Sequence, residues 1–434
     1  MSKPAQPGTA TAYDPATPSP ATTTVVLLFA VLCAIYVVSQ FLRNSVGVIA
    51  PDIARELDLA PQALGILSSA FFLGFAAAQI PLGATIDRYG PKRCMMASVG
   101  LAVLGCAVFA WSQSLAALTV GRVLMGIGCS SFFMGPLTIY TRWFRADRFS
   151  TLAGIQLGIG TMGTLFATAP LALSTELYGW RATFLFVGVG AAIVGLLVAV
   201  IVRDNPPGHV DESHRPGSLR ESFAGLGEVI RVPGFWQLFS IQFVGYSTFV
   251  AILGLWGGPF VTDVLGFDLV ERGNIMLVMA AAHIVGLFCW GPTDRLFGGR
   301  FVPVTIGAMW TATMMVVLCL FGDRGGAVTY AIFIVLGFGA AYVPVQTAHG
   351  RALFDRRLVG RGITLLNLAT MGGVFVMQAV TGVIIGAFSP EPGPAGDLVR
   401  PFVAYQAAFA FLAIAIVAAW FIYRTAPDPR VGAE

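Results

Sequence analysis

The chain has 434 residues, of which 56% are hydrophobic and only 11% are charged, and its formal net charge is +4. Soluble globular proteins carry about 25% charged residues, so this composition excludes a fold that is solvated only by water. No Walker sequence, catalytic nucleophile arrangement or metal-ligand spacing is present, and we therefore expect no enzyme activity, no cofactor and no nucleic-acid partner. The six cysteines lie in or beside apolar runs, where small core residues are expected.

The first 23 residues are rich in Pro, Thr, Ala and Ser, a composition that predicts a disordered tail. The apolar run that follows is full length and lacks a basic flank, so no cleavable signal peptide is expected.

Twelve apolar runs then follow one another, each long enough for the roughly 20 residues that cross about 30 Å of hydrocarbon. They predict an all-α integral membrane protein with twelve transmembrane helices. The expected spans are 24–50, 62–86, 92–111, 115–140, 150–174, 180–202, 235–261, 271–293, 301–321, 327–350, 360–388 and 402–423.

A long polar segment, 204–233, separates six spans from six, and features of the first half recur 207 to 211 positions later. We therefore predict two related six-helix bundles, 24–203 and 234–424, joined by a central loop at 204–233 and followed by a tail at 425–434. The matched features are Pro51 and Pro259, Asp87-Arg88 and Asp294-Arg295, and Gly126-x-Gly128 and Gly337-x-Gly339.

Basic residues are distributed unevenly among the turns. If the first span runs outward, the cytoplasmic segments hold most of the Lys and Arg residues, while the outer turns hold many of the acids. The positive-inside rule then places both termini in the cytoplasm, and we expect a multi-pass protein of a bacterial inner membrane.

The turn after the second span reads Gly-Ala-Thr-Ile-Asp-Arg-Tyr-Gly-Pro-Lys-Arg over 83–93, and it resembles the signature loop of the major facilitator superfamily. Gly121 to Gly128 resembles the second motif of that family, and Gly179-Trp180-Arg181 is also typical of it. The resemblance extends over 24–424 and implies secondary transport in a two-bundle fold. It implies as partners a small-molecule substrate, the lipid bilayer and a coupling proton or counter-solute, with a monomeric chain.

A carboxylate and several cations in a tight glycine turn can pair with neighbouring helix ends. By resemblance, Asp87 and Arg88 help to lock the cytoplasmic side in the outward-open state. Pro91 stands where the family usually has a base, so Lys92 or Arg93 is expected to replace it. The second copy, with Asp294 and Arg295, is degenerate. The alternative interpretation of this loop is a topology anchor alone.

Arg43 lies inside the first span, where a cation is costly unless it meets a wet cavity or a partner. Tyr36, Gln40, Arg43 and Gly47 follow helical spacing and are expected on one face. The position resembles the substrate-binding arginine of the organophosphate exchangers and sugar-acid transporters of this family, which implies an organic-anion substrate. A structural or gating role, or snorkelling, is the alternative.

The seventh span supplies no second arginine, and this favours a carboxylate bound by one arginine over a phosphate bound by two. Tyr246, Tyr342 and Asn367, together with Gln40, are the further candidates for substrate contact. The alternatives for function are efflux of amphipathic drug-like compounds, uptake of a neutral or aromatic nutrient such as a vitamin, and a sensor that moves nothing. The glycine-proline signature of drug antiporters is missing from the fifth span.

Arg122, in the fourth span, resembles a family arginine associated with proton coupling; the alternative is a structural anchor that pairs with helix carbonyls or a rim acid. Apart from Glu271, the first residue of the eighth span, no Asp or Glu falls within the twelve predicted spans, although buried carboxylates commonly couple transport to protons. Rim acids such as Asp52, Glu176 or Asp263 remain as coupling candidates, as do His283 and His349. His283 alternatively packs by hydrogen bonding.

Overall fold

The structure, a computed structural model, describes residues 22–428 except 145, 207–225, 356–357 and 393–397. The predicted tails therefore fall outside the described residues over 1–21 and 429–434, as does most of the central loop. Thr22 and Thr23, which the sequence assigns to the tail, instead begin the first helix.

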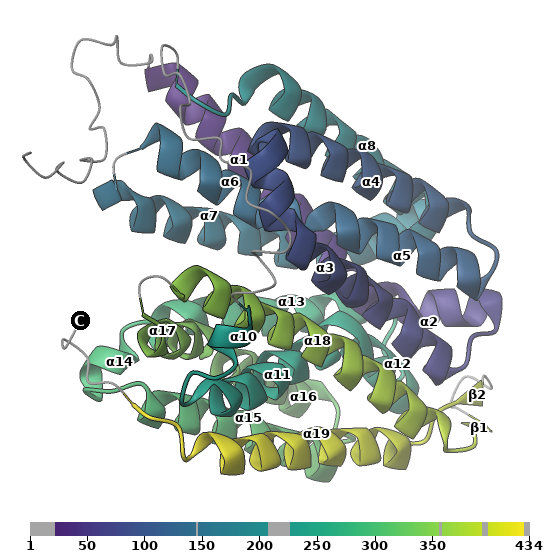
Figure 1. Cartoon of the computed structure of the whole chain (residues 1–434). Coiled ribbons are helices and arrows are strands. Elements are labelled where there is room, and N and C mark those ends of the chain that lie inside the picture. The colour runs from purple at the N-terminus through teal and green to yellow at the C-terminus, as the bar shows by residue number, and fades with distance from the viewer. Residues whose placement is uncertain (1–21, 145, 207–225, 356–357, 393–397, 429–434) are drawn as a thin grey trace, which may run out of the picture.

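Helices make up almost all of the described chain, and they form two bundles that lie one above the other in Figure 1. The first bundle contains α1 (Thr22–Asn44), α2 (Val46–Leu57), α3 (Pro61–Tyr89), α4 (Pro91–Trp111), α5 (Leu115–Cys129), α6 (Ser131–Trp143), α7 (Ala146–Phe166) and α8 (Ala169–Ile201).

The second bundle begins with the short helix α10 (Leu226–Val229) and ends with a small antiparallel pair of strands and a last long helix. Its other elements are α11 (Phe235–Ala251), the π-helix η1 (Ile252–Trp256), α12 (Gly257–Leu265), α13 (Leu269–Trp290), α14 (Thr293–Leu296), α15 (Phe301–Phe321), α16 (Gly326–Gly339), α17 (Val343–Leu353), α18 (Val359–Gly386), β1 (Glu391–Pro392), β2 (Leu398–Val399) and α19 (Phe402–Tyr423).

The described residues contain 11 helical segments that are long and apolar enough to cross a membrane, and the sequence of α7 supplies a shorter apolar helix over Thr151–Phe166. The fifth span consists of α7 and the first part of α8, because α8 continues through Gly179 (φ 77°) into the sixth span. The prediction of twelve membrane helices is thus confirmed. The fifth span is broken at 167–168 and continues to the bend at Gly179, five residues beyond its predicted end at 174.

Four spans besides the fifth are discontinuous, which the apolar runs did not predict. The interruptions lie at Ser45 in the first span, Ser130 in the fourth, η1 in the seventh and 340–342 in the tenth. Each precedes a proline by a few residues: Pro51, Pro136, Pro259 and Pro344. Proline has no N–H to donate to the carbonyl four residues earlier, and this weakens the helix on the N-terminal side of each of these prolines. Interrupted helices are typical of transporter binding sites.

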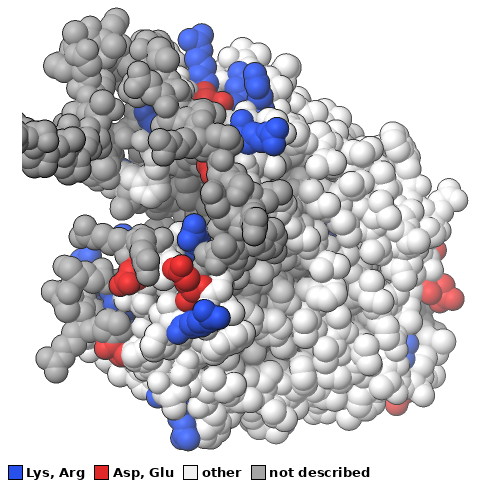
Figure 2. Space-filling model, in the orientation of Figure 1, with Lys and Arg blue, Asp and Glu red and all other residues white. Residues whose placement is uncertain are grey.

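The outer surface of the bundles is apolar. Leu196 and Val200 of α8 and Phe288 of α13 are 63%, 72% and 71% exposed, which water alone does not favour. On the face shown in Figure 2, charged side chains gather towards the two ends, and a band between them carries none. This band is the surface expected to contact lipid.

The glycine pairs of the internal repeat make equivalent contacts in the two bundles. A methyl group at Gly126 would lie 2.0 Å from the Phe71 carbonyl oxygen of α3, and one at Gly337 would lie 2.3 Å from the Met279 carbonyl oxygen of α13. A methyl group at Gly128 would meet the backbone of α4, and one at Gly339 would meet the Trp310 side chain of α15. The repeat therefore preserves the packing of the fourth and tenth spans against their neighbours.

We call the end at which α1 begins and α19 ends the terminal side, and the opposite end the distal side; the terminal side is at the left in Figure 1. The two bundles touch closely on the distal side. A methyl group at Gly47 would lie 2.3 Å from the Leu253 carbonyl oxygen, and one at Gly65 would lie 2.7 Å from that of Gln378.

An ion pair crosses the same distal contact. Arg272 of α13 donates from Nη2 to the Asp52 carboxylate of α2 and from Nη1 to the Thr262 hydroxyl at 3.0 Å. The Arg272 side chain is 2% exposed. We call the approach of Gly47 and Gly65 to the second bundle, together with the Asp52–Arg272 pair, the distal closure.

Candidate functional site

A cavity of about 390 Å³ lies between the bundles, on the terminal side of the distal closure. Four elements of each bundle form its walls. The first wall comes from α1, α3, α6 and α7: Tyr36, Ser39, Gln40, Arg43, Asn44, Phe75, Gln79, Phe133, Met134, Leu157, Thr161 and Thr164. The second wall comes from α11, α13, α17 and α18: Gln242, Tyr246, Phe249, Ala280, His283, Ile284, Leu287, Val343, Pro344, Thr347, Ile363, Leu366, Asn367, Thr370 and Met371.

Arg43 lines the first wall and is 7% exposed. Its guanidinium carbon lies 4.9 Å from the centre of the Phe75 ring, a cation–π contact. Its Nε is buried without a hydrogen bond, and no ion pair or hydrogen bond joins the guanidinium to any other described residue. An almost buried cation of this kind has its donors available for a bound anion.

The last turn of α1 holds Arg43 in place. Asn44 donates from Nδ2 to the Gln40 carbonyl oxygen at 3.0 Å and to the Thr164 hydroxyl of α7 at 3.3 Å. Arg122 of α5 donates from Nη1 to the Leu42 carbonyl oxygen at 2.6 Å, and the Ser45 hydroxyl donates to the same oxygen at 3.1 Å. The interrupted end of this helix is thus tied to two others.

Arg122 itself lies outside the cavity wall and is completely buried. Its guanidinium carbon lies 4.8 Å from the centre of the Phe71 ring, while its Nε and Nη2 have no hydrogen-bond partner. The bond to Leu42 is the helix-carbonyl contact expected of a structural anchor. A role in proton coupling stays a prediction.

Tyr36 and Gln40 stand beside Arg43 on α1. The Tyr36 ring packs against Phe133, with ring centres 5.0 Å apart, and fills the space over Gly160 of α7. Gln40 is 6% exposed, and its Oε1 has no hydrogen-bond partner. Gly47, the fourth member of the predicted face, follows the interruption and belongs to the distal closure rather than to the cavity.

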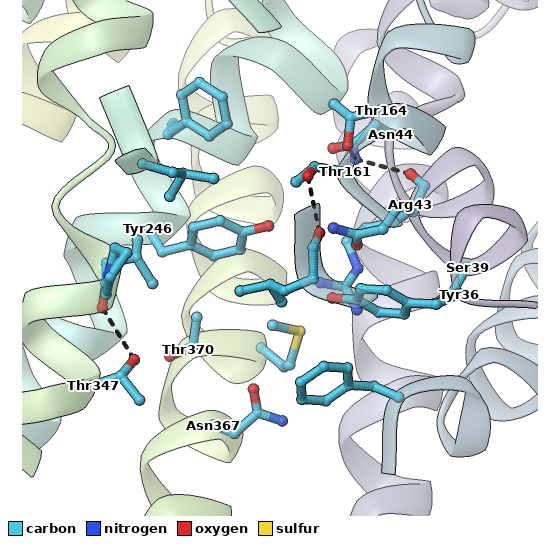
Figure 3. Close-up of a pocket in the computed structure, with 18 of the residues that line it drawn as sticks. Tyr36, Ser39, Arg43, Asn44, Thr161, Thr164, Tyr246, Thr347, Asn367 and Thr370 are labelled. Carbon is cyan, nitrogen blue, oxygen red and sulfur yellow. Dashed lines mark hydrogen bonds between the residues drawn. The ribbon is translucent and has the colours of Figure 1, made fainter. Parts of the chain in front are cut away.

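The second wall carries neutral polar groups. Tyr246 reaches from α11 with its hydroxyl directed across the cavity towards Arg43, and Asn367 of α18 lies lower on the same wall (Figure 3). Neither side chain has a hydrogen bond to another described residue. The Thr370 hydroxyl instead donates to Gln242 Oε1 at 3.3 Å.

His283 belongs to the second wall and is held by two contacts. Its ring stacks on Phe249, with ring centres 3.8 Å apart, and its Nδ1 lies 3.1 Å from the Gly337 carbonyl oxygen. A carbonyl oxygen only accepts, so Nδ1 carries the proton and Nε2 of the neutral ring is an acceptor. The predicted choice between coupling and packing stays open, because packing contacts do not test proton transfer.

Tyr342 is placed differently from the prediction of a cavity residue. It is fully buried inside the second bundle, where it packs against Gly245, Gly307 and Trp290 and does not line the cavity. Tyr342 belongs to the interruption at 340–342, between α16 and α17.

All residues of the signature loop, 83–93, belong to the described part of the chain. Asp87, Arg88 and Arg93 are exposed, and the Arg88 guanidinium lies over the Tyr89 ring at 5.3 Å. Lys92 donates its N–H to the Asp204 carboxylate at 2.8 Å and its ammonium to the Ala199 carbonyl oxygen at 2.7 Å. The loop is therefore bound through Lys92 to the end of α8, and locking by Asp87 and Arg88 stays a prediction.

The second copy of the loop is bound in a related way. Asp428, after α19, accepts the N–H groups of Arg300 and Phe301, each at 3.0 Å. Asp294 accepts the N–H of Arg295 at 2.7 Å and lies 3.8 Å from Arg300 Nε. An aspartate that follows the last helix of each bundle thus caps the helix after each loop.

Sequence reasoning missed several cavity residues. Thr161 and Thr164 of α7 and Thr370 of α18 line the walls. Threonine is common in apolar helices, because its hydroxyl can donate to a carbonyl oxygen of the preceding helical turn, as those of Thr161 and Thr370 do. The spacing of Thr161 with Thr164, and of Asn367 with Thr370, is the signal that would have placed them on common faces.

Comparison with known proteins agrees with this fold. The family model described as Major Facilitator Superfamily matches residues 32–351. A probable sulfoacetate transporter of Cupriavidus necator is 24% identical over 284 residues, which are 62% of this chain and 65% of the relative, so the match spans less than two thirds of that protein. The hexuronate transporter of Bacillus subtilis is 23% identical over 398 residues, 84% of this chain and 89% of the relative.

A solved structure of a bacterial homologue of the human lysosomal transporter Spinster, in an inward-facing and unoccupied conformation, superposes with a TM-score of 0.75. It is 18% identical, and the superposition covers 93% of this chain and 97% of the other. These relatives and this fold are those of transporters and not of enzymes. The chain is a multi-pass membrane protein that belongs to the major facilitator superfamily.

Proposed function

We propose that the chain transports a small organic anion by alternating access, and that Arg43 binds the carboxylate of that anion. The observation that supports this is the Arg43 guanidinium, which lines the central cavity almost buried and without a paired acid among the described residues. A cation at membrane depth is stabilised by a partner, and a planar guanidinium binds a carboxylate through two parallel hydrogen bonds.

The relatives support an anionic substrate. One is described as a probable sulfoacetate transporter and another as a hexuronate transporter, and both of these solutes carry a carboxylate. The cavity, at about 390 Å³, has the size of a site for a small molecule.

The side on which the cavity opens follows from exposure and charge. Leu157 (40% exposed) and Thr347 (also exposed) lie on the terminal side of the buried Arg43. The terminal side carries Arg88, Lys92, Arg93, Arg142, Arg203, Arg295, Arg300, Arg351 and Arg424 among the described residues. By the positive-inside rule we assign it to the cytoplasm, so this conformation opens inward.

The test is uptake into proteoliposomes that contain the purified chain, with labelled hexuronate and sulfoacetate as first substrates. Arg43→Ala should lower uptake at limiting substrate by about ten- to hundredfold, because a hydrogen bond to a charged group is worth about 1.5–3 kcal/mol. Arg43→Lys keeps the charge but loses the planar fork, and it should retain an intermediate rate.

Arg324→Ala is the matched control, because this arginine is exposed on the distal side, away from the cavity. It should leave uptake unchanged. If Arg43→Ala transports every anion as well as the parent chain, the assignment of Arg43 is wrong. If the purified chain binds an anion but moves none, the protein is a sensor and transport itself is refuted.

A further inference from the structure

The two walls of the cavity differ in charge although both are polar. Among the described lining residues Arg43 carries the sole permanent charge, and it belongs to the first wall. The second wall offers Tyr246, His283 and Asn367, none of which carries a permanent charge. A solute that spans the cavity therefore meets a cation at one end and neutral hydrogen-bonding groups at the other.

The polar groups of the second wall have hydrogen-bond donors and acceptors that no described residue uses. The Tyr246 hydroxyl and the Asn367 amide have no partner among the described residues, and His283 uses Nδ1 for Gly337, which leaves Nε2 as an acceptor. Together they present donors and acceptors within one wall. Hydroxyl groups, which donate and accept at once, match such a mixture better than an acceptor-only group does.

The space between these two polar ends is largely apolar. Phe75 and Phe133 from the first bundle and Met371 from the second line the cavity. Tyr246 points across this space towards Arg43, so the charged and neutral groups face one another (Figure 3). The arrangement suits a solute whose charge is confined to one end.

We infer that the cavity selects a hydroxylated monocarboxylate, with the carboxylate on Arg43 and the hydroxyl groups on Tyr246, Asn367 and His283. This inference rests on the proposed function and narrows its substrate class. A second anionic group would be desolvated against a wall without a cation, at a cost of several kcal/mol. An anion without hydroxyl groups would leave the polar groups of the second wall unpaired, and sites built for hydroxyl groups reject such analogues strongly.

Four six-carbon probes separate charge from hydroxylation: glucuronate has both features, glucose lacks the charge, hexanoate lacks the hydroxyl groups, and glucarate carries a second carboxylate. Each is titrated against the purified full-length chain, and affinity is obtained from the rise in melting temperature. Glucuronate should bind at least about tenfold more tightly than each of the other three, the difference expected from one lost hydrogen bond or one unpaired charge.

Variants of the second wall provide the matched test. Tyr246→Phe and Asn367→Leu should each weaken glucuronate by about tenfold and leave hexanoate unchanged, whereas Arg43→Gln should weaken both anions. A variant that merely misfolds has a lower melting temperature even in the absence of probe, and its affinity for every probe falls equally. Such a variant is recognised because its affinity for hexanoate falls as well.

Hexanoate as tight as glucuronate, or glucarate tighter than glucuronate, would overturn the inference about the substrate class while Arg43-dependent anion binding stands. Binding of all four probes that is indifferent to Arg43→Gln would overturn the proposed function as well. The two failures are therefore distinct.

Discussion

At Gly126 the contact between two helices depends on the absence of one carbon atom. Its position against the Phe71 carbonyl leaves 2.0 Å for a Cβ, less than any real side chain tolerates. In lipid, where apolar surface is solvated equally well inside and outside a bundle, close approach of backbones through small residues supplies much of the association energy.

Gly126→Ala should therefore destabilise the purified protein by about 1–3 kcal/mol, the usual cost of overpacking. The measurement is the melting temperature in detergent. Gly100→Ala is the control, because a methyl group there meets nothing within 4 Å and alanine favours the helix. Equal melting temperatures for the two variants would show that α3 and α5 separate without cost.

Arg43 and Arg122 show how differently two intramembrane arginines are used. Both were recognised in the sequence as costly cations, yet only Arg43 lines the cavity, whereas Arg122 binds the Leu42 carbonyl one residue before Arg43. Sequence spacing alone does not distinguish these roles, because each arginine lies on a mostly apolar helix with no acid nearby in the chain.

At the scale of the elements, the interrupted helices decide which groups meet. The first span turns at Ser45, so that α1 presents Arg43 to the cavity and α2 carries Asp52 to the second bundle. One membrane span thereby contributes both to the candidate site and to the distal closure. In the alternating-access cycle that we propose, this span would link an anion on Arg43 to the opening of that closure.

Arg272→Ala should shift the protein towards conformations that are open on the distal side. The Asp52–Arg272 pair joins the two bundles in this conformation, which is closed on the distal side, and removing one partner of a buried pair is destabilising. We expect at least about a tenfold shift, or about 1.4 kcal/mol. The measurement is the rate at which a membrane-impermeant thiol reagent labels Ser39→Cys from the distal side.

Arg55→Ala is the control for this experiment. Arg55 lies 4.0 Å from the same Asp52 carboxylate, but its side chain is 64% exposed, and exposed pairs contribute little. Equal labelling in the Arg272→Ala and Arg55→Ala proteins would mean that the ion pair does not hold the distal side closed.

At the scale of the whole molecule, the two bundles enclose a cavity whose described lining has one cation and no acid. In the alternating-access cycle that we propose, an empty cavity closed on both sides would seal Arg43 away from water without a counter-charge, whereas a bound anion supplies one. The loaded protein should therefore change conformation faster than the empty protein.

The expected consequence is exchange. Efflux from vesicles preloaded with labelled anion should accelerate several-fold when the same anion is added outside, because return of the empty protein no longer limits the cycle. Arg43→Gln, compared at anion concentrations high enough to fill its weakened site, should abolish this acceleration, since the uncharged cavity is occluded without the penalty. Identical efflux with and without external anion would argue against the electrostatic explanation.

Hydropathy, charge asymmetry and the signature loop were sufficient to predict twelve membrane helices in two bundles, because the length of a span and the cost of a charge in lipid are local properties of the chain. Arg43 stood out for the same reason. Which residues form the cavity walls could not be predicted from local properties of the chain. Tyr342 is buried in the second bundle, while Thr161, Thr347 and Thr370 line the cavity.

Only the tertiary structure decided these placements, because the rotation of each helix depends on contacts with distant segments, such as Gly47 with Leu253 and Gly65 with Gln378. Lipid and bundle interior are both apolar, so the sequence carries little contrast between the two faces of a membrane helix. The sequence by itself determined that this chain crosses a membrane many times and that one of its spans contains an arginine, Arg43. The packing of its two halves determined which neutral side chains that arginine faces.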